Sequence, residues 1–179
     1  MIIIAGLGNP DKKYEHTRHN LGFRVLDLVA GGAEWEDKYD SKLIKLKDVL
    51  LVKPQSFMNN SGKALKQIFK FYPDSELIVI HDDLDFPLGS LKIMKNISSA
   101  GHNGVQNIID ELSTQDFIRI RLGIDNPETR GQIPGEDYVL QKFTEKEEKL
   151  VTEVIDNARD AIEIIQTSGI ETAQSRFNG

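Results

Sequence analysis

Apolar residues occur along this chain in two kinds of run: short β-branched stretches, and longer stripes at helical spacing. The short stretches have the length and composition of buried strands. One pair of them flanks Lys47-Asp48 and predicts a hairpin. Strands are predicted at 1–6, 43–46, 49–52, 77–80, 91–95 and 117–122.

The longer stripes repeat at the spacing of one helix face and predict helices over 19–30, 64–72 and 105–112. Gly31-Gly32 is a stop signal for the first, and Pro73 closes the second. Residues 125–136 are polar and contain Gly and Pro, which predicts a loop.

A capping box opens the last predicted helix, because Thr144 stands three residues before Glu147. Gly169 occupies the position of its C-terminal cap. The apolar face of this helix is predicted to consist of Leu150, Val154, Ile155, Ala158, Ile162 and Ile165.

Strands and helices alternate throughout, with one early hairpin. This order favours an α/β fold: one three-layer domain over 1–179, with a mixed, mostly parallel, twisted sheet flanked by helices. A chain of 179 residues with 39% hydrophobic content fits one such domain.

Composition excludes several classes of protein. The chain has no cysteine, so it has no disulfide framework, thiolate nucleophile or Cys-type zinc site. The N-terminal apolar run is too short to span a membrane and lacks a basic flank, which predicts a cytoplasmic protein with no membrane partner. The net charge of −6 lies in residues 125–179, because 1–124 carry equal numbers of acidic and basic residues, so an RNA-binding surface is not excluded.

Polar motifs cluster where predicted strands end. Thr17-Arg18-His19-Asn20 follows the first strand and its glycine-containing turn, and 81–85 follows the strand at 77–80. Carboxamides recur at 57–62 and 101–104. Open α/β sheets bind ligands at this edge, and histidine exchanges protons near neutrality. A base, carboxylates and neutral amides together indicate water-mediated acyl chemistry.

Each motif also has other interpretations. The turn after the first strand resembles a dinucleotide-binding loop only weakly, because Asp11 replaces the third glycine. His19 could simply cap a helix, and its spacing from His16 is poor evidence for a metal. Asn59 and Asn103 could be turn residues or donors to a developing oxyanion. No G-x-S-x-G elbow occurs, which favours activated water over a serine acyl-enzyme.

The acidic segment leaves two interpretations nearly level. Asp82, Asp83 and Asp85 could supply oxygen ligands to Mg²⁺, as in a phosphohydrolase. Alternatively, one of these carboxylates could accept a hydrogen bond from an imidazole and fix its tautomer.

Six motifs in register resemble the bacterial-type peptidyl-tRNA hydrolase family. The resemblance implies an esterase that cuts the bond between a nascent peptide and the 3′ ribose of its tRNA. It also implies a small monomer that needs no cofactor or metal. The motifs are 6–10 with Tyr14, 17–22, 53–59, 81–85 with Pro87 and Gly89, 101–104, and 119–123.

The resemblance also implies roles for individual residues. His19 would be the general base and Asp82 the carboxylate that orients it. Asn9 and Asn103 would hold the peptide and the water, and Asn59 with Met58 would position the substrate. Tyr14 would lie in the substrate-binding stretch, Arg121 would grip the terminal phosphate of the tRNA, and Lys92 or Lys95 would assist because Met94 replaces a usual basic residue.

Two other functions compete with this one. An RNA-binding adaptor on the same scaffold would bind without catalysis, and a Mg²⁺-dependent phosphohydrolase would use the acidic segment. Excess chelator separates the three, because it would stop the metal enzyme and spare the esterase, while the adaptor would never turn over.

Overall fold

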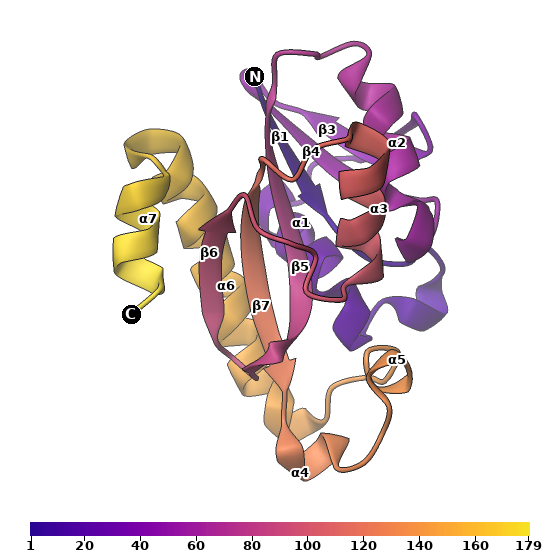
Figure 1. Cartoon of the computed structure of the whole chain (residues 1–179), viewed down its shortest axis with the longest axis vertical. Helices are drawn as coiled ribbons and strands as arrows, with labels where there is room; N and C mark the ends of the chain where they lie inside the picture. Colours follow the sequence, from indigo (N-terminus) through magenta and orange to yellow (C-terminus); the bar gives the residue numbers. More distant parts are fainter.

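The structure, a computed structural model, describes residues 1–179, and a seven-stranded sheet forms its centre (Figure 1). The strand order is β2-β3-β4-β1-β5-β7-β6. Strands β4, β1, β5 and β7 run parallel, whereas β2, β3 and β6 pair antiparallel at the edges. The strands are β1 (Ile2–Gly6), β2 (Glu36–Lys38), β3 (Ser41–Lys45), β4 (Val49–Pro54), β5 (Glu76–Pro87), β6 (Leu91–Lys95) and β7 (Ile118–Asp125).

Helices cover both faces of the sheet. The alternation of side chains along β1 divides the core, because Ile4 packs on one face while Ile3 and Ala5 pack on the other. Helices α1 (Leu21–Ala30) and α6 (Glu145–Ser168) cover the Ile4 face, and α2 (Ser61–Phe69) and α3 (Asn103–Leu112) cover the opposite one. The predicted three-layer α/β fold with a mixed sheet is confirmed.

Several short elements were not predicted. Strand β2 is polar and exposed, and it exists through its pairing with β3. The predicted loop at 125–136 contains α4 (Pro127–Arg130) and the first two residues of α5 (Gly135–Tyr138). Beyond Gly169 the chain forms a further helix, α7 (Ile170–Phe177), which packs beside α6 and β6.

The long helix α6 differs from prediction at one position of its apolar face. The capping box is present, since the Thr144 hydroxyl accepts from the Glu147 backbone and the Glu147 carboxylate accepts from the Thr144 backbone. Leu150, however, is 43% exposed, and the neighbouring Val151 is buried instead. None of the helices is both long and apolar enough to cross a membrane.

Strand β5 extends well past the four residues predicted. It continues to Pro87, so His81, Asp82 and Asp83 lie within the strand and pair with β7 rather than following it as a loop. Helix α1 packs directly against the chain that follows β1. A Cβ atom added at Gly22 would lie only 2.3 Å from the Leu7 backbone nitrogen, so glycine is needed there. This approach brings the residues before α1 to that end of the sheet.

Candidate functional site

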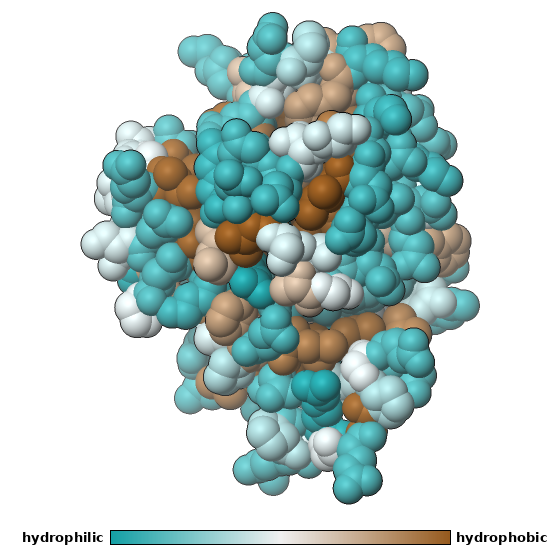
Figure 2. Space-filling model, viewed as in Figure 1, coloured by the Kyte–Doolittle hydropathy of each residue, from teal (hydrophilic) through white to brown (hydrophobic).

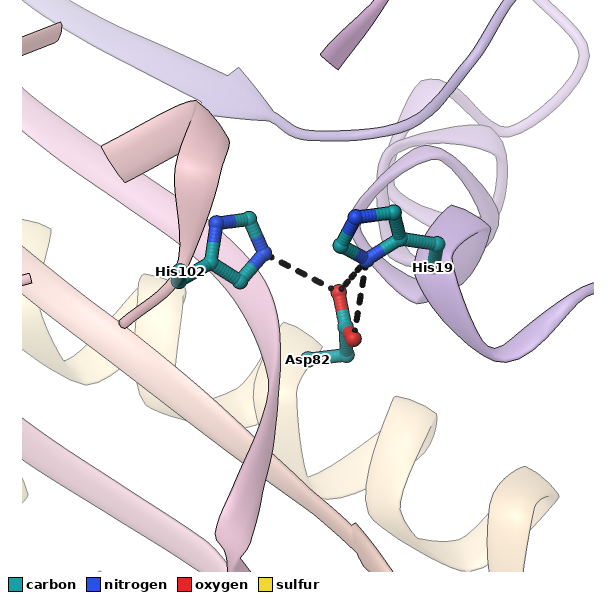
Figure 3. A group of neighbouring side chains, drawn as sticks. All are labelled: His19, Asp82 and His102. Atoms are coloured by element: carbon teal, nitrogen blue, oxygen red, sulfur yellow. Dashed lines mark hydrogen bonds and ion pairs between the residues drawn. The ribbon is translucent and has the colours of Figure 1, made fainter. Parts of the chain in front are cut away.

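Two histidines converge on one carboxylate at the carboxyl edge of the sheet (Figure 3). His19 lies in the short helix η2 (Arg18–Asn20) before α1, Asp82 lies on β5, and His102 caps α3. The Nδ1 atom of His19 lies 2.9 and 3.0 Å from the two Asp82 oxygens. The Nε2 atom of His102 lies 3.2 Å from Oδ1 of the same carboxylate. The predicted pairing of His19 with Asp82 is therefore present in the geometry.

The hydrogen bonds of the two rings fix which nitrogens hold protons. His102 Nδ1 accepts from the Val105 backbone N–H at 3.2 Å, so Nε2 holds the proton and donates to Asp82. In the neutral His19 ring, Nδ1–H also donates to Asp82, and Nε2 is then unprotonated. The His19 ring bonds to protein groups through Nδ1 alone, so the lone pair of Nε2 in the neutral ring is free to accept a proton.

Electrostatics support a charged Asp82 beside a basic His19. Burial opposes the charge of Asp82, which is 1% exposed, but attraction to His19 and hydrogen bonds from His102 and His19 hold its pKa well below the usual value. Burial also pulls the pKa of His19 down. The charge and hydrogen bond of Asp82 outweigh this effect, so the pKa of His19 is raised.

A third histidine, His81, is buried next to His102. His81 is fully buried, its Nδ1–H donates to the Asp82 carbonyl at 2.7 Å, and its ring packs edge-on against His102 at 4.6 Å between centroids. Burial holds the pKa of His81 well below that of a free histidine, with repulsion from His102 adding to the effect. His81 is therefore a neutral packing partner.

His19, Asp82 and His102 are also the residues whose spacing could suit a metal ion. Single ligand atoms of His19, Asp82 and His102 lie within 4.8 Å of one another. His102 would have to release its Nε2 proton to bind a metal there, and Nδ1 would then lose its role as acceptor at the start of α3. The arrangement fits proton transfer better than metal binding.

The geometry does not favour the alternative of a Mg²⁺ site, because Asp82 pairs with histidines whereas Asp83 and Asp85 both pair with Arg121. Adjacent side chains of a strand point to opposite faces of the sheet. Asp82 accordingly contacts histidines, whereas Asp83 pairs with Arg121 Nε at 2.5 Å and accepts from the Asp85 backbone at 2.9 Å. The carboxylates of Asp82 and Asp83 each have separate partners.

Two cavities meet at His19. One, of about 310 Å³, extends past Asp82 and His102, and the other, of about 270 Å³, extends past Asn9. Figure 2 shows a hydrophobic band between the start of α3 and α5, and further hydrophobic patches lie elsewhere on the same face. Both cavities are lined by His19, Asn103, Glu136 and Val139.

The amide of Asn9 is oriented by its neighbours. Its Oδ1 accepts from the Met58 backbone N–H at 2.9 Å, so its Nδ2 is left as a donor at the cavity. Asn20 holds the Asn9 backbone on both sides, accepting from its N–H and donating to its carbonyl, each at 2.9 Å. This positioning role of Asn20 was not predicted, although the residue belongs to a motif singled out in the sequence.

The other predicted substrate residues line the same cavity as Asn9. Tyr14 is half-buried, Met58 is buried, and Asn59 and Asn103 are exposed. The structure thus brings together five polar and apolar side chains from four separate segments of the chain.

The residues predicted to grip a phosphate are not assembled. The Arg121 side chain is 8% exposed, pairs with Asp83 and contacts the Met94 sulfur at 3.3 Å, so its charge already has a partner inside the protein and its predicted phosphate contact stays a prediction. Lys92 Nζ donates to the Asn178 carbonyl at 2.6 Å, and Lys95 lies 3.6 Å from Asp116. Lys92 and Lys95 are three residues apart on β6 and point to opposite faces.

Comparison with known proteins places this geometry in a family. The sequence profile described as peptidyl-tRNA hydrolase matches residues 3–179. The chain is 45% identical to the peptidyl-tRNA hydrolase of Thermodesulfovibrio yellowstonii, with 99% of each covered. It is 44% identical to that of Caldanaerobacter subterraneus over the full length of both. A crystal structure of the Acinetobacter baumannii peptidyl-tRNA hydrolase superposes with a TM-score of 0.88 at 28% identity, covering 100% of this chain and 95% of that one.

Proposed function

Because the chain belongs to the peptidyl-tRNA hydrolase family, we propose that it hydrolyses the ester bond between a peptide and the 3′ ribose of tRNA. The main support is the unprotonated Nε2 of His19, which Asp82 orients at the junction of two cavities. His19 is the general base in this proposal, and Asp82 stabilises the imidazolium that forms.

The reaction needs no covalent intermediate, because the ester is already activated. His19 Nε2 takes a proton from a water molecule, and the water oxygen attacks the ester carbonyl carbon. The Nδ2 donor of Asn9 stabilises the negative carbonyl oxygen of the tetrahedral intermediate, as one such donor typically lowers a barrier by about 3 kcal/mol. Collapse breaks the bond to the ribose oxygen, which receives the proton from His19.

The two cavities suit a substrate that extends on both sides of the scissile bond. Neutral amides at Asn9, Asn59 and Asn103 can bond to peptide backbone groups regardless of side chain. A blocked amino group would be recognised by hydrogen bonds that a free ammonium cannot reproduce. The proposal includes action as a monomer in the cytoplasm.

Release of an N-blocked aminoacyl group from tRNA tests the proposal. We expect turnover of the blocked species, much slower turnover of the unblocked one, and no loss of rate in excess chelator. No release of the blocked group by the wild-type protein would refute the proposed function. Loss of activity in chelator alone would instead indicate a metal-dependent reaction.

A further inference from the structure

Arg18, directly before His19, has no part in the proposed reaction, yet it is one of the most buried charged side chains. It is 1% exposed, and its Nη2 donates to both Glu147 oxygens at 2.8 Å. Glu147 lies at the third position of α6 and is 3% exposed. A buried ion pair therefore joins the residue next to the proposed base to the start of the longest helix.

Arg18 also holds the segment that lines the cavities, here called the cover segment (residues 135–142, which include α5). Its Nη1 donates to the carbonyls of Lys142 at 2.6 Å and Gln141 at 3.3 Å. The guanidinium lies 4.1 Å from the Tyr138 ring centroid. One planar cation thus contacts the cover segment through both carbonyls and a ring face.

Backbone bonds connect the same two segments at His19 itself. The His19 N–H donates to the Val139 carbonyl at 2.8 Å, and the Arg18 N–H donates to the Gln141 carbonyl at 3.0 Å. Thr17 and Lys142 form an antiparallel bridge. Val139 lines both cavities, so the backbone of the base and the cavity wall belong to one hydrogen-bonded pair of segments.

The Glu147 carboxylate accepts three hydrogen bonds in addition to those from Arg18. It accepts from the Thr144 backbone at 2.7 Å, the Thr129 hydroxyl at 2.9 Å and the Asn126 amide at 3.1 Å. Burial opposes its charge, but these bonds and Arg18 lower the pKa of Glu147 overall. The carboxylate therefore stays charged and ties α4 and α6 to Arg18.

We infer that the Arg18–Glu147 pair is a positioning device for catalysis, which holds His19 and the cover segment in register with each other. The inference rests on the proposed function. Arg18 and Glu147 touch neither substrate nor the reacting atoms; they act through the position of His19 and of the cavity wall.

The first test is Arg18→Lys. Lysine keeps the charge but lacks the planar fork by which Nη1 reaches the two carbonyls while Nη2 reaches Glu147. We expect kcat to fall about 100-fold, as for a displacement of a catalytic group by about 1 Å, and KM to rise because the cavity wall loosens. The acid limb of the kcat/KM profile should also move to lower pH, because His19 is held less closely to Asp82.

A matched control exists at the next residue of α6. Arg24 of α1 and Glu148 of α6 form a second pair at 2.8 Å, but it is partly exposed and makes no hydrogen bond to the cover segment. Arg24→Lys and Glu148→Gln should keep kcat, KM and the pH profile within about twofold of the wild type, since exposed pairs contribute little.

A neutral double variant, Arg18→Met with Glu147→Gln, covers the case in which Arg18→Lys does not fold. It leaves no unpaired buried charge, and glutamine still serves the capping box. We expect a folded protein with the same loss of kcat. Wild-type values of kcat, KM and pH profile in this variant, or in folded Arg18→Lys, would overturn the inference. An inactive wild-type protein would refute the proposed function instead.

Discussion

Asp82 and Asp83 are neighbours on β5 with the same side chain and similar burial, yet they face different environments. Asp82 accepts from two imidazoles, and one of these, His19, keeps a free nitrogen at a cavity. Asp83 binds Arg121, whose guanidinium donates hydrogen bonds but has no nitrogen that can accept one. The difference shows that the partner of a buried carboxylate, rather than its burial, decides whether it can serve proton transfer.

Removing the free nitrogen should have the largest effect. His19→Ala should lower kcat about 1,000-fold, because the general base is lost, while the protein stays folded, since His102 still donates to Asp82. Release of the blocked aminoacyl group, measured beside thermal unfolding, checks this. Turnover near the wild-type rate in a folded variant would contradict the general-base role.

Exchanging the two carboxylates for amides should separate their roles. Asp82→Asn should lower kcat roughly 100- to 10,000-fold, because the amide no longer enforces the His19 tautomer. Asp83→Asn should leave kcat nearly unchanged but destabilise the fold by about 3 kcal/mol, because the buried Arg121 loses its nearest counter-charge and keeps only Asp85 at 3.7 Å. Urea unfolding and kinetics on both variants measure the contrast. Equal kinetic losses would show that the two aspartates do not differ as described.

The raised pKa of His19 predicts opposite trends of activity and stability with pH. Activity should rise with pH through that pKa, above the ordinary 6.5, because only the neutral ring accepts a proton. The stabilisation from protonated His19 beside Asp82 is complete below about pH 6.5 and is lost as pH rises through the folded pKa. Kinetics and unfolding over the same pH series test this, and an acid limb below pH 6 would contradict it.

The smallest effect is expected from the lysines of β6. Lys92→Gln or Lys95→Gln should each reduce the salt slope of tRNA binding by at most about one counterion, because the two side chains do not form one patch. Binding titrations at several salt concentrations measure the slope. A loss of several counterions from one substitution would show that β6 is a major RNA contact.

The pairing of His19 with Asp82 was implied by the family resemblance, whereas the residue pattern alone left open which carboxylate of 82–85 would meet an imidazole, and the pairing of the strands explains why the two residues meet. Strands β1 and β5 are neighbours and parallel, so the residues near their carboxyl ends share one edge of the sheet. The bond from His102 to Asp82 was not predictable, because it depends on how His102 caps α3. The Arg18–Glu147 pair joins residues far apart in sequence, and only the docking of α6 brings them together.

Arg121 illustrates what the residue pattern could not settle. An arginine on a strand near a proposed site suggests a phosphate contact, but its environment depends on the register of β5 and β7. That register sets Arg121 opposite His81, so its side chain lies diagonally across from Asp83 on the same face. Likewise, β2 and α7 have few apolar residues, and only their contacts with β3 and β6 reveal them.

The protonation of the two imidazoles that share Asp82 tests the central claim most directly. Ring ¹⁵N NMR above the pKa of His19 should find His19 protonated at Nδ1 and bare at Nε2, and His102 in the reverse tautomer. A proton on His19 Nε2 under these conditions would contradict the account, because the nitrogen facing the cavities could then accept none from water.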